Sequence, residues 1–222
     1  MSEICIFGDS VGKGVTWNPV LLKYEALKLN LLSLFGRDNI NIKNYSVFGS
    51  TISKGLNLAQ RHERDLYKYD HVFLEFGGND CDFDWADISK NPQADHQPKT
   101  PLHIFEKLYA ELIEKVLKAK GKPVLLTLPP INAQKYFTHF SKDLQKKNLL
   151  SWLGDVEMIY RWHEMYSLAV TKLARQMSVP LVDVRSAFLS DRFCPDLLCD
   201  DGIHPTEKGH KLIYQTVLDS YK

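Results

Sequence analysis

The sequence has no long hydrophobic run and no excess of charge of either sign. No stretch approaches the ~20 consecutive apolar residues that a membrane-spanning helix needs. The 28 lysine and arginine residues nearly balance the 27 aspartate and glutamate residues, so the chain has no net field that attracts nucleic acid or an anionic membrane. We therefore expect neither a membrane span nor a nucleic-acid partner.

Cysteine is also scarce, and the four cysteines form no Cys-x-x-Cys pair. Two of them, Cys194 and Cys199, lie close in sequence to three further potential ligands, Asp200, Asp201 and His204. A single cluster with irregular spacing favours ordinary thiols over a metal site. We expect neither a metal ion nor another cofactor.

The N-terminus has none of the features of a targeting segment. The chain begins Met-Ser-Glu and continues at once into an apolar segment. It has no basic leader, no apolar run of signal-peptide length and no small-residue cleavage site. We therefore expect a cytoplasmic protein, unless a leader has been removed.

Short apolar segments alternate with amphipathic ones. Continuous apolar runs are typical of strands buried on both faces, and here they cover residues 3–8, 40–49, 71–78, 123–130 and 179–188. Apolar residues three and four apart predict helices over residues 19–35, 101–121 and 159–177. The alternation predicts an α/β protein, a three-layer α/β/α sandwich around a five-stranded parallel sheet.

The length of 222 residues, 44% of them hydrophobic, fits a single domain spanning residues 1–222. Two polar segments, residues 81–100 and 131–158, interrupt the alternation of strands and helices. Loops of this length in a compact domain are usually lids or walls of a binding site. We expect these two to shape the substrate pocket.

The glycine-rich turn after the first apolar run allows two kinds of chemistry. Gly8, Gly12 and Lys13 resemble a phosphate-binding loop, in which backbone N–H groups surround an anion. Such a loop has four residues between its glycines and a Ser or Thr after its lysine. Here three residues separate the glycines, and Gly14 follows Lys13. Nucleotide binding by the Gly8–Lys13 loop is therefore disfavoured, and it stands as an alternative from a different functional class.

The turn also carries a serine, and the next two predicted strands end in polar groups as well. Ser10 follows the first strand, Gly49 the second and Asn79 the third. Because ligands bind beyond the carboxyl ends of parallel strands, these groups should lie close together. A hydroxyl nucleophile, a backbone N–H and a side-chain amide are the parts of an acyl-transfer site, in which donors stabilise the oxyanion of the tetrahedral intermediate.

A serine hydroxyl needs a base, and "DGIHP" at residues 201–205 supplies one. Asp201 precedes His204 by three residues around Gly202, so one turn can bring the carboxylate to the imidazole. The other histidines, such as His163, lie within strand or helix patterns with no carboxylate paired to them in the same loop. We expect those to be surface or structural residues.

Four motifs occur in order along the whole chain: "FGDS", "SVFGS", "GGND" and "DGIHP". Together they resemble the signature blocks of the SGNH hydrolases, also called GDSL-type esterases and lipases. The resemblance implies a flavodoxin-like fold, with Ser10 as nucleophile, His204 as general base and then acid, and Asp201 as its orienting partner. It also implies an oxyanion hole formed by the backbone N–H groups of Ser10 and Gly49 and the side-chain amide of Asn79.

The resulting hypothesis is a serine esterase that cleaves small acyl esters, acetyl esters among them, through an acyl-enzyme. Lysophospholipase or thioesterase activity is the nearest alternative, and transfer of the acyl group to an acceptor other than water would use the same residues. A binding module without catalysis is an alternative from another class. The partner is a small-molecule ester, and residues expected to line its pocket are Asp80, Asp82, Trp85 and Tyr136.

Overall fold

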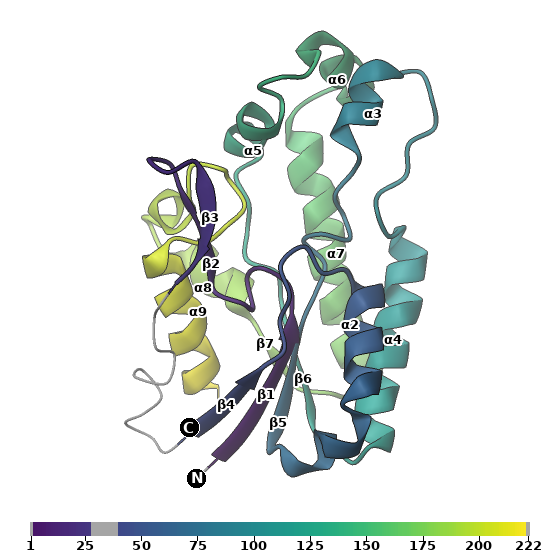
Figure 1. The fold of residues 1–222 in the computed structure, drawn as a ribbon, viewed down its shortest axis with the longest axis vertical. Helices are drawn as coiled ribbons and strands as arrows, with labels where there is room; N and C mark the ends of the chain where they lie inside the picture. The colour runs from purple at the N-terminus through teal and green to yellow at the C-terminus, as the bar shows by residue number, and fades with distance from the viewer. Residues whose placement is uncertain (1, 28–39, 221–222) are drawn as a thin grey trace.

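The central feature of the fold is a parallel sheet with the strand order β4-β1-β5-β6-β7. The computed structural model describes residues 2–27 and 40–220, and Figure 1 shows their arrangement. The five strands are β1 (Ser2–Gly8), β4 (Ile40–Asn44), β5 (His71–Glu75), β6 (Pro123–Leu126) and β7 (Leu181–Val182). The prediction of a five-stranded parallel sheet is confirmed. Four of the strands end several residues before the predicted limits, because the residues beyond them form turns or, after β7, a helix.

Alternate residues of each strand face opposite sides of the sheet and pack against different helices. Cys5 and Phe7 of β1 belong to a core shared with α2 (Ile52–Arg61), α4 (Leu102–Lys118) and α7 (Glu157–Gln176). On the other side, Ile4 packs with α8 (Val184–Ser190) and α9 (Glu207–Asp219). This alternation is what the pleat of a strand buried on both faces requires, and it produces the predicted three layers (Figure 1).

The two segments predicted as long loops contain helices, which corrects that part of the sequence analysis. Residues 81–100 form α3 (Trp85–Lys90), and residues 131–158 form α5 (Ala133–Phe140) and α6 (Lys146–Leu153). These helices share a small aromatic-rich core of their own that includes Phe83 and Trp85. They lie beyond the carboxyl ends of the strands (Figure 1). Two short 3-10 helices complete the described elements, Glu63–Lys68 and Cys194–Leu197.

The prediction of a helix over residues 19–35 is wrong for its first part, and residues 28–35 lie outside the described part of the chain. An antiparallel hairpin forms instead from β2 (Val15–Asn18) and β3 (Lys23–Ala26). Trp17 and Tyr24 face each other across the strands with ring centroids 4.8 Å apart, and the Asn18 side chain accepts the N–H groups of Val20 and Leu21. Cross-strand aromatic packing and an Asn-Pro turn therefore outweigh the helical spacing of the leucines.

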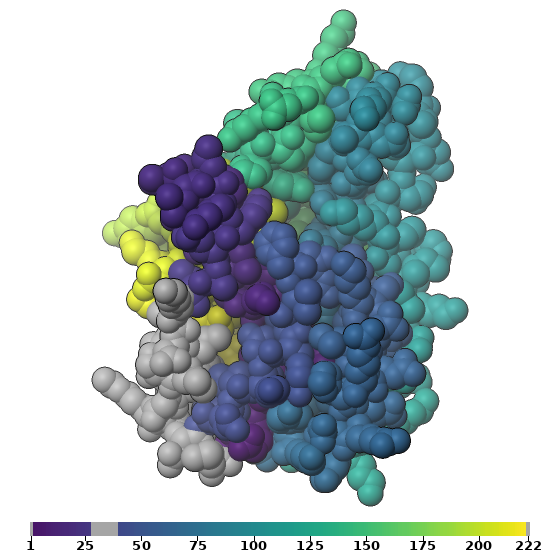
Figure 2. All heavy atoms as spheres, in the orientation of Figure 1, coloured from purple at the N-terminus to yellow at the C-terminus, as the bar shows by residue number. Residues whose placement is uncertain are grey.

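The hairpin rests on residues that are far away in the sequence. His210 of α9 hydrogen bonds to the Val15 carbonyl at 2.9 Å, and the Trp17 ring meets His139 of α5 edge to face. Figure 2 shows the hairpin, in dark purple, lying against the green segment that contains α5 and α6. The hairpin and the helices beyond the sheet thus form adjoining walls above the strand ends.

Gly55 provides a test of how tightly α2 is seated. An exposed glycine inside a helix usually costs about 1 kcal/mol relative to alanine. At Gly55, however, an added Cβ would lie 2.2 Å from Cζ of the buried Phe76 ring. We expect Gly55→Ala to lower the free energy of unfolding by about 1–3 kcal/mol, the usual cost of overpacking. Urea denaturation measures this change, with Ser53→Ala at an exposed position of the same helix as the control. A stabilised Gly55→Ala variant would show that the helix can move away from the sheet.

Candidate functional site

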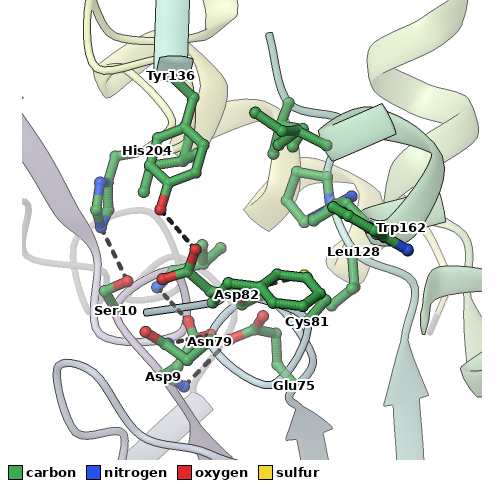
Figure 3. Close-up of a pocket in the computed structure, with 18 of the residues that line it drawn as sticks. Asp9, Ser10, Glu75, Asn79, Cys81, Asp82, Leu128, Tyr136, Trp162 and His204 are labelled. Atoms are coloured by element: carbon green, nitrogen blue, oxygen red, sulfur yellow. Dashed lines mark hydrogen bonds between the residues drawn. The ribbon is translucent and has the colours of Figure 1, made fainter. Parts of the chain in front are cut away.

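A chain of three side chains joins the turn after β1 to the loop before α9. His204 Nε2 lies 2.9 Å from Ser10 Oγ, and His204 Nδ1 lies 2.6 Å from an Asp201 carboxylate oxygen. Figure 3 shows the imidazole of His204 directed at the Ser10 hydroxyl. All three residues are buried. The structure therefore brings together the serine, histidine and aspartate that the sequence analysis selected, although 190 residues or more separate Ser10 from the other two.

The loop around Asp201 holds its carboxylate in place. One carboxylate oxygen accepts the backbone N–H groups of Ile203 and His204, each at 3.1 Å, and the other oxygen faces the imidazole. Burial alone raises the pKa of Asp201, but the hydrogen bonds and the charge of His204 outweigh it and hold the pKa below its usual value. Gly202 allows this geometry because its φ is +81° and an added Cβ would lie 2.5 Å from the Tyr136 nitrogen. Asp201 is thus an ionised partner for the histidine.

Asp9 connects the serine turn to the turn after β5. One of its carboxylate oxygens accepts the Val11 N–H at 2.8 Å, and the other accepts the Asn79 side-chain amide at 3.0 Å (Figure 3). Asp9 itself is buried. These contacts fix the orientation of Asn79 and leave its second amide hydrogen free to point elsewhere.

The backbone N–H groups of Ser10 and Gly49 have no hydrogen-bond acceptor among residues 2–27 and 40–220. Gly49 has a φ of +68°, a conformation that L side chains rarely adopt, and its neighbour Phe48 lines the same cavity as Ser10 and Asn79. Three donors, two of them backbone and one a side-chain amide, are therefore available around the turn that carries Ser10. Such donors are what an oxyanion needs.

A second buried carboxyl group lies beneath the serine turn. Glu75, the last residue of β5, accepts the backbone N–H groups of Asp9 at 3.3 Å and Gly12 at 3.1 Å. Burial, followed by the neighbouring Asp9 charge, raises the pKa of Glu75 well above its usual value. We assign the proton of this pair to Glu75, because the Asp9 carboxylate also accepts two N–H groups that stabilise its charge.

The cavity beside Ser10 has a volume of about 150 Å³. Asp82, Trp85 and Tyr136 line it, as expected. Asp82 accepts both Nε1–H of Trp85 and the hydroxyl of Tyr136, each at 2.8 Å, and it forms an ion pair with Lys99 at 2.7 Å. The carboxylate therefore organises one wall of the cavity.

The expectation that Asp80 lines the cavity is not met. Its carboxylate lies buried behind the cavity wall and accepts the backbone N–H of Ile52 at the start of α2, at 3.0 and 3.2 Å to its two oxygens. Burial raises the pKa of Asp80 to about 6. This position favours negative charge because helix N-termini carry partial positive charge. Asp80 supports α2 and is absent from the set of residues that form the pocket.

Several lining residues were missed from the sequence. Tyr24 lies with its ring centroid 4.9 Å from that of His204, and the Phe48 ring stacks on the same imidazole at 6.1 Å. The sequence around Tyr24 does not indicate a pocket residue, because its segment has helical spacing. Phe48 falls within a predicted strand. His163, expected to be a surface or structural residue, is buried and lines the cavity. In the sequence, His163 has the same helical spacing as the core residues of α7, so the spacing does not distinguish it from them.

Among residues 2–27 and 40–220, no group of three or more His, Cys, Asp or Glu side chains is arranged to hold a metal ion. Within the same ranges, no helix has the length and apolarity needed to cross a membrane. The four cysteines are free thiols, and three of them are buried. Cys199 makes a short contact with Thr16 at 3.0 Å rather than with a metal-binding partner.

Comparison with known proteins identifies the family. Residues 6–212 match the model of the GDSL-like lipase/acylhydrolase family, and the chain belongs to it. A relative in Bacillus subtilis (strain 168), named uncharacterized lipoprotein YqeF, is 24% identical over 229 residues, which cover 98% of this chain and 88% of that protein. The family membership confirms the resemblance drawn from the four motifs.

Solved structures of known proteins have the same fold as this chain. A lipase/acylhydrolase from Enterococcus faecalis superposes with a TM-score of 0.68 at 18% identity, covering 99% of this chain and 95% of that chain. Axe2, an acetyl-xylooligosaccharide esterase from Geobacillus, superposes with a TM-score of 0.61 at 19% identity, covering 98% and 93% of the two chains. At these identities the likeness shows the fold, which is that of the SGNH hydrolases.

The proton assigned to Glu75 predicts a pH-dependent effect on stability. Between the usual glutamate pKa near 4.3 and the raised value, folded wild type holds a proton that the unfolded chain has lost, so its stability falls by up to about 1.4 kcal/mol per pH unit. Glu75→Gln has a neutral amide at this position, so its free energy of unfolding lacks this dependence on pH. We expect its free energy of unfolding, relative to wild type, to rise from pH 5 to pH 8.

Urea denaturation at a series of pH values measures this difference. The control is Glu111→Gln at an exposed position of α4, which should leave the difference from wild type nearly constant with pH. A relative stability of Glu75→Gln that stays flat or falls over the same pH range would mean that Glu75 is ionised in the folded protein.

Proposed function

We propose that this protein is a serine esterase that hydrolyses small acyl esters through an acyl-enzyme. The observation that carries the proposal is the continuous line of hydrogen bonds from Asp201 through His204 to the Ser10 hydroxyl. In the proposed reaction, Ser10 Oγ attacks the ester carbonyl while His204 Nε2 takes its proton. His204 then gives that proton to the leaving alcohol, and water hydrolyses the acyl-enzyme by the reverse sequence.

The surrounding groups have distinct roles in this proposal. Asp201 fixes the imidazole tautomer and stabilises the imidazolium that forms when His204 takes the proton. The backbone N–H groups of Ser10 and Gly49, together with the Asn79 amide, stabilise the oxyanion. Asp9 holds Asn79 by a 3.0 Å hydrogen bond and thereby positions one of these donors. No step in the scheme requires a metal ion or an organic cofactor.

The size of the cavity supports a small acyl group. A cavity of about 150 Å³ holds a group of roughly the size of benzene. That volume favours a short acyl ester over the long chain of a lysophospholipid. It suits an acetyl ester, the kind of ester for which Axe2, an acetyl-xylooligosaccharide esterase, is named. Hydrolysis of thioesters, and transfer of the acyl group to an acceptor other than water, would use the same residues. Only measured turnover of each substrate distinguishes these activities from ester hydrolysis.

The alternative of nucleotide binding receives no support from the Gly8–Lys13 loop. The Gly12 N–H donates to the Glu75 carboxyl group, and the Lys13 N–H donates to the Asp9 carbonyl. The backbone donors that a phosphate loop offers to its ligand are thus used within the protein. Negatively charged Asp9 and Asp82 beside the cavity also oppose a polyanion.

A location in the cytoplasm and a single domain over residues 1–222 remain predictions. The matched relative in Bacillus subtilis is named a lipoprotein. Fractionation of cells that express the natural gene would decide the location.

Replacement of the nucleophile tests the proposal directly. We expect wild type to hydrolyse p-nitrophenyl acetate and butyrate, and Ser10→Ala to lose at least about 10⁴-fold in kcat. Wild type should gain a single fluorophosphonate adduct on Ser10 by intact-mass and peptide analysis, and Ser10→Ala should gain none. Ser53→Ala, the same substitution at an exposed serine of α2, is the matched control and should behave as wild type. Absence of both turnover and adduct in folded wild type contradicts the serine-esterase proposal.

Asn79 tests the oxyanion hole separately. Asn79→Ala removes one donor to the transition state, so we expect kcat for p-nitrophenyl acetate to fall about 10²–10³-fold while KM changes little. Steady-state kinetics and the rate of fluorophosphonate labelling measure this effect. Urea denaturation of the variant checks that it is folded before urea is added. An unchanged kcat would remove Asn79 from the oxyanion hole.

A further inference from the structure

The cavity beside Ser10 extends to α7, where it meets a histidine that the proposed reaction does not use. His163 lies on the buried face of α7 together with Ile159, and both line the cavity. Figure 3 shows Trp162 and Leu128 on the opposite side of the cavity from Ser10 and His204. Trp162, the neighbour of His163 on α7, thus lies across the cavity from the reacting serine.

His163 is a polar group in surroundings that give it no partner. Its side chain is 5% exposed, and Nδ1 is buried without a hydrogen-bond partner among residues 2–27 and 40–220. An unsatisfied polar group in such a place is costly. Other residues that line the cavity near α7 are apolar or aromatic: Phe83, Leu128, Pro129, Ile159 and Trp162. Because Nδ1 has almost no accessible surface, a ligand in the cavity reaches only the other ring nitrogen, Nε2, and a hydrogen bond to Nε2 is the polar contact that His163 can offer.

The imidazole is neutral at physiological pH. Burial, and then the charge of nearby Arg185, lowers the pKa of His163 to about 3. A neutral imidazole has one donor nitrogen and one acceptor nitrogen. Arg185 offers no free charge to a ligand, because its guanidinium pairs with Glu164 and donates to the Leu128 carbonyl and the Tyr160 hydroxyl.

These charges define what the far end of the cavity can accept. Asp9 and Asp82 line the same cavity, so an anionic substrate group would be repelled. A cationic group beside His163 would be opposed by the charge of the nearby Arg185. The group that fits is therefore uncharged and carries an oxygen able to hydrogen bond.

The orientation of the substrate follows from the role of His204. Because His204 must protonate the leaving alcohol, that alcohol has to lie on the His204 side of the ester. On that side the half-exposed rings of Tyr24 and Phe48 contact the imidazole. The acyl group then extends the other way, toward the part of the cavity that α7 lines.

We propose that His163 is a specificity residue that selects an acyl group bearing an uncharged keto or hydroxyl oxygen near its distal end. The proposal rests on the serine-esterase function proposed above, and it deepens that function by naming the class of acyl group. His163 contacts the acyl chain and takes no part in the bond-making steps.

The experiment compares matched p-nitrophenyl esters that differ only in a keto oxygen. The pairs are 4-oxopentanoate with pentanoate, and 5-oxohexanoate with hexanoate. The kcat/KM of each ester is divided by the rate constant for its hydrolysis by hydroxide, which corrects for intrinsic reactivity. We expect wild type to prefer the better-fitting keto ester by about tenfold, the worth of one hydrogen bond in an enclosed site. His163→Leu should abolish this preference, and His163→Gln, which can still hydrogen bond, should restore part of it.

p-Nitrophenyl acetate separates this proposal from the one on which it rests. The acetyl group is too short to extend far from Ser10, so wild-type turnover of this ester reports the esterase function without the contact to His163. Loss of acetate turnover in wild type would contradict the esterase function itself. Acetate turnover with equal normalised rates for the keto and plain esters in wild type would overturn only the role of His163.

A structural role for His163 predicts a different pattern. If the imidazole serves only to satisfy a buried neighbour such as Arg185, whose Nε also lacks a partner among the described residues, His163→Leu should lower the free energy of unfolding. It would then leave the keto preference of the enzyme unchanged. That result overturns the proposal. The wild-type comparison needs no variant, so the proposal can be tested even if His163→Leu does not fold.

Discussion

The carboxyl group of Asp9 joins the turn after β1 to the turn after β5, and the placement of the site depends on this junction. Its two oxygens accept the Val11 N–H and the Asn79 amide, while its own N–H donates to Glu75. Ser10 lies between Asp9 and Val11, so its position follows from these bonds. A parallel sheet brings strand ends to one edge, but side-chain contacts of this kind decide how the groups at that edge face one another.

Burying this junction requires that the acidic groups beneath the site do not all carry charge. Asp9, Glu75 and Asp80 are all buried near one another. Asp80 faces the N-terminus of α2, where backbone N–H groups compensate part of its charge. Glu75 does not face a helix N-terminus, and its proximity to Asp9 adds to the effect of burial in raising its pKa. A neutral Glu75 donates to the Asp9 carboxylate and accepts the N–H groups of Asp9 and Gly12.

The parts of the site that were predictable from sequence are those whose position follows from strand ends. Ser10, Gly49 and Asn79 each come directly after an apolar run, and Asp201 and His204 are neighbours in one turn. Tyr24 and His163 were not predictable, because each reaches the cavity through contacts between distant segments. The cross-strand pairing of Trp17 with Tyr24 overrides a helical pattern, and His163 has the spacing of a core residue on α7. Periodicity identifies a buried face, but it does not say that a cavity adjoins that face.

In the proposed function, the division between the sheet and the helices above it separates catalysis from selection. Ser10, Asn79 and His204 are tied to strand ends and to the α9 loop, whereas Trp85 and Trp162 belong to an aromatic-rich core that is distinct from the two cores flanking the sheet. His163 lies at the boundary, since α7 packs on the sheet at one end and on the aromatic-rich core at the other. In the proposed function, a polar residue at that boundary adds chemical selectivity to a wall that otherwise selects by shape.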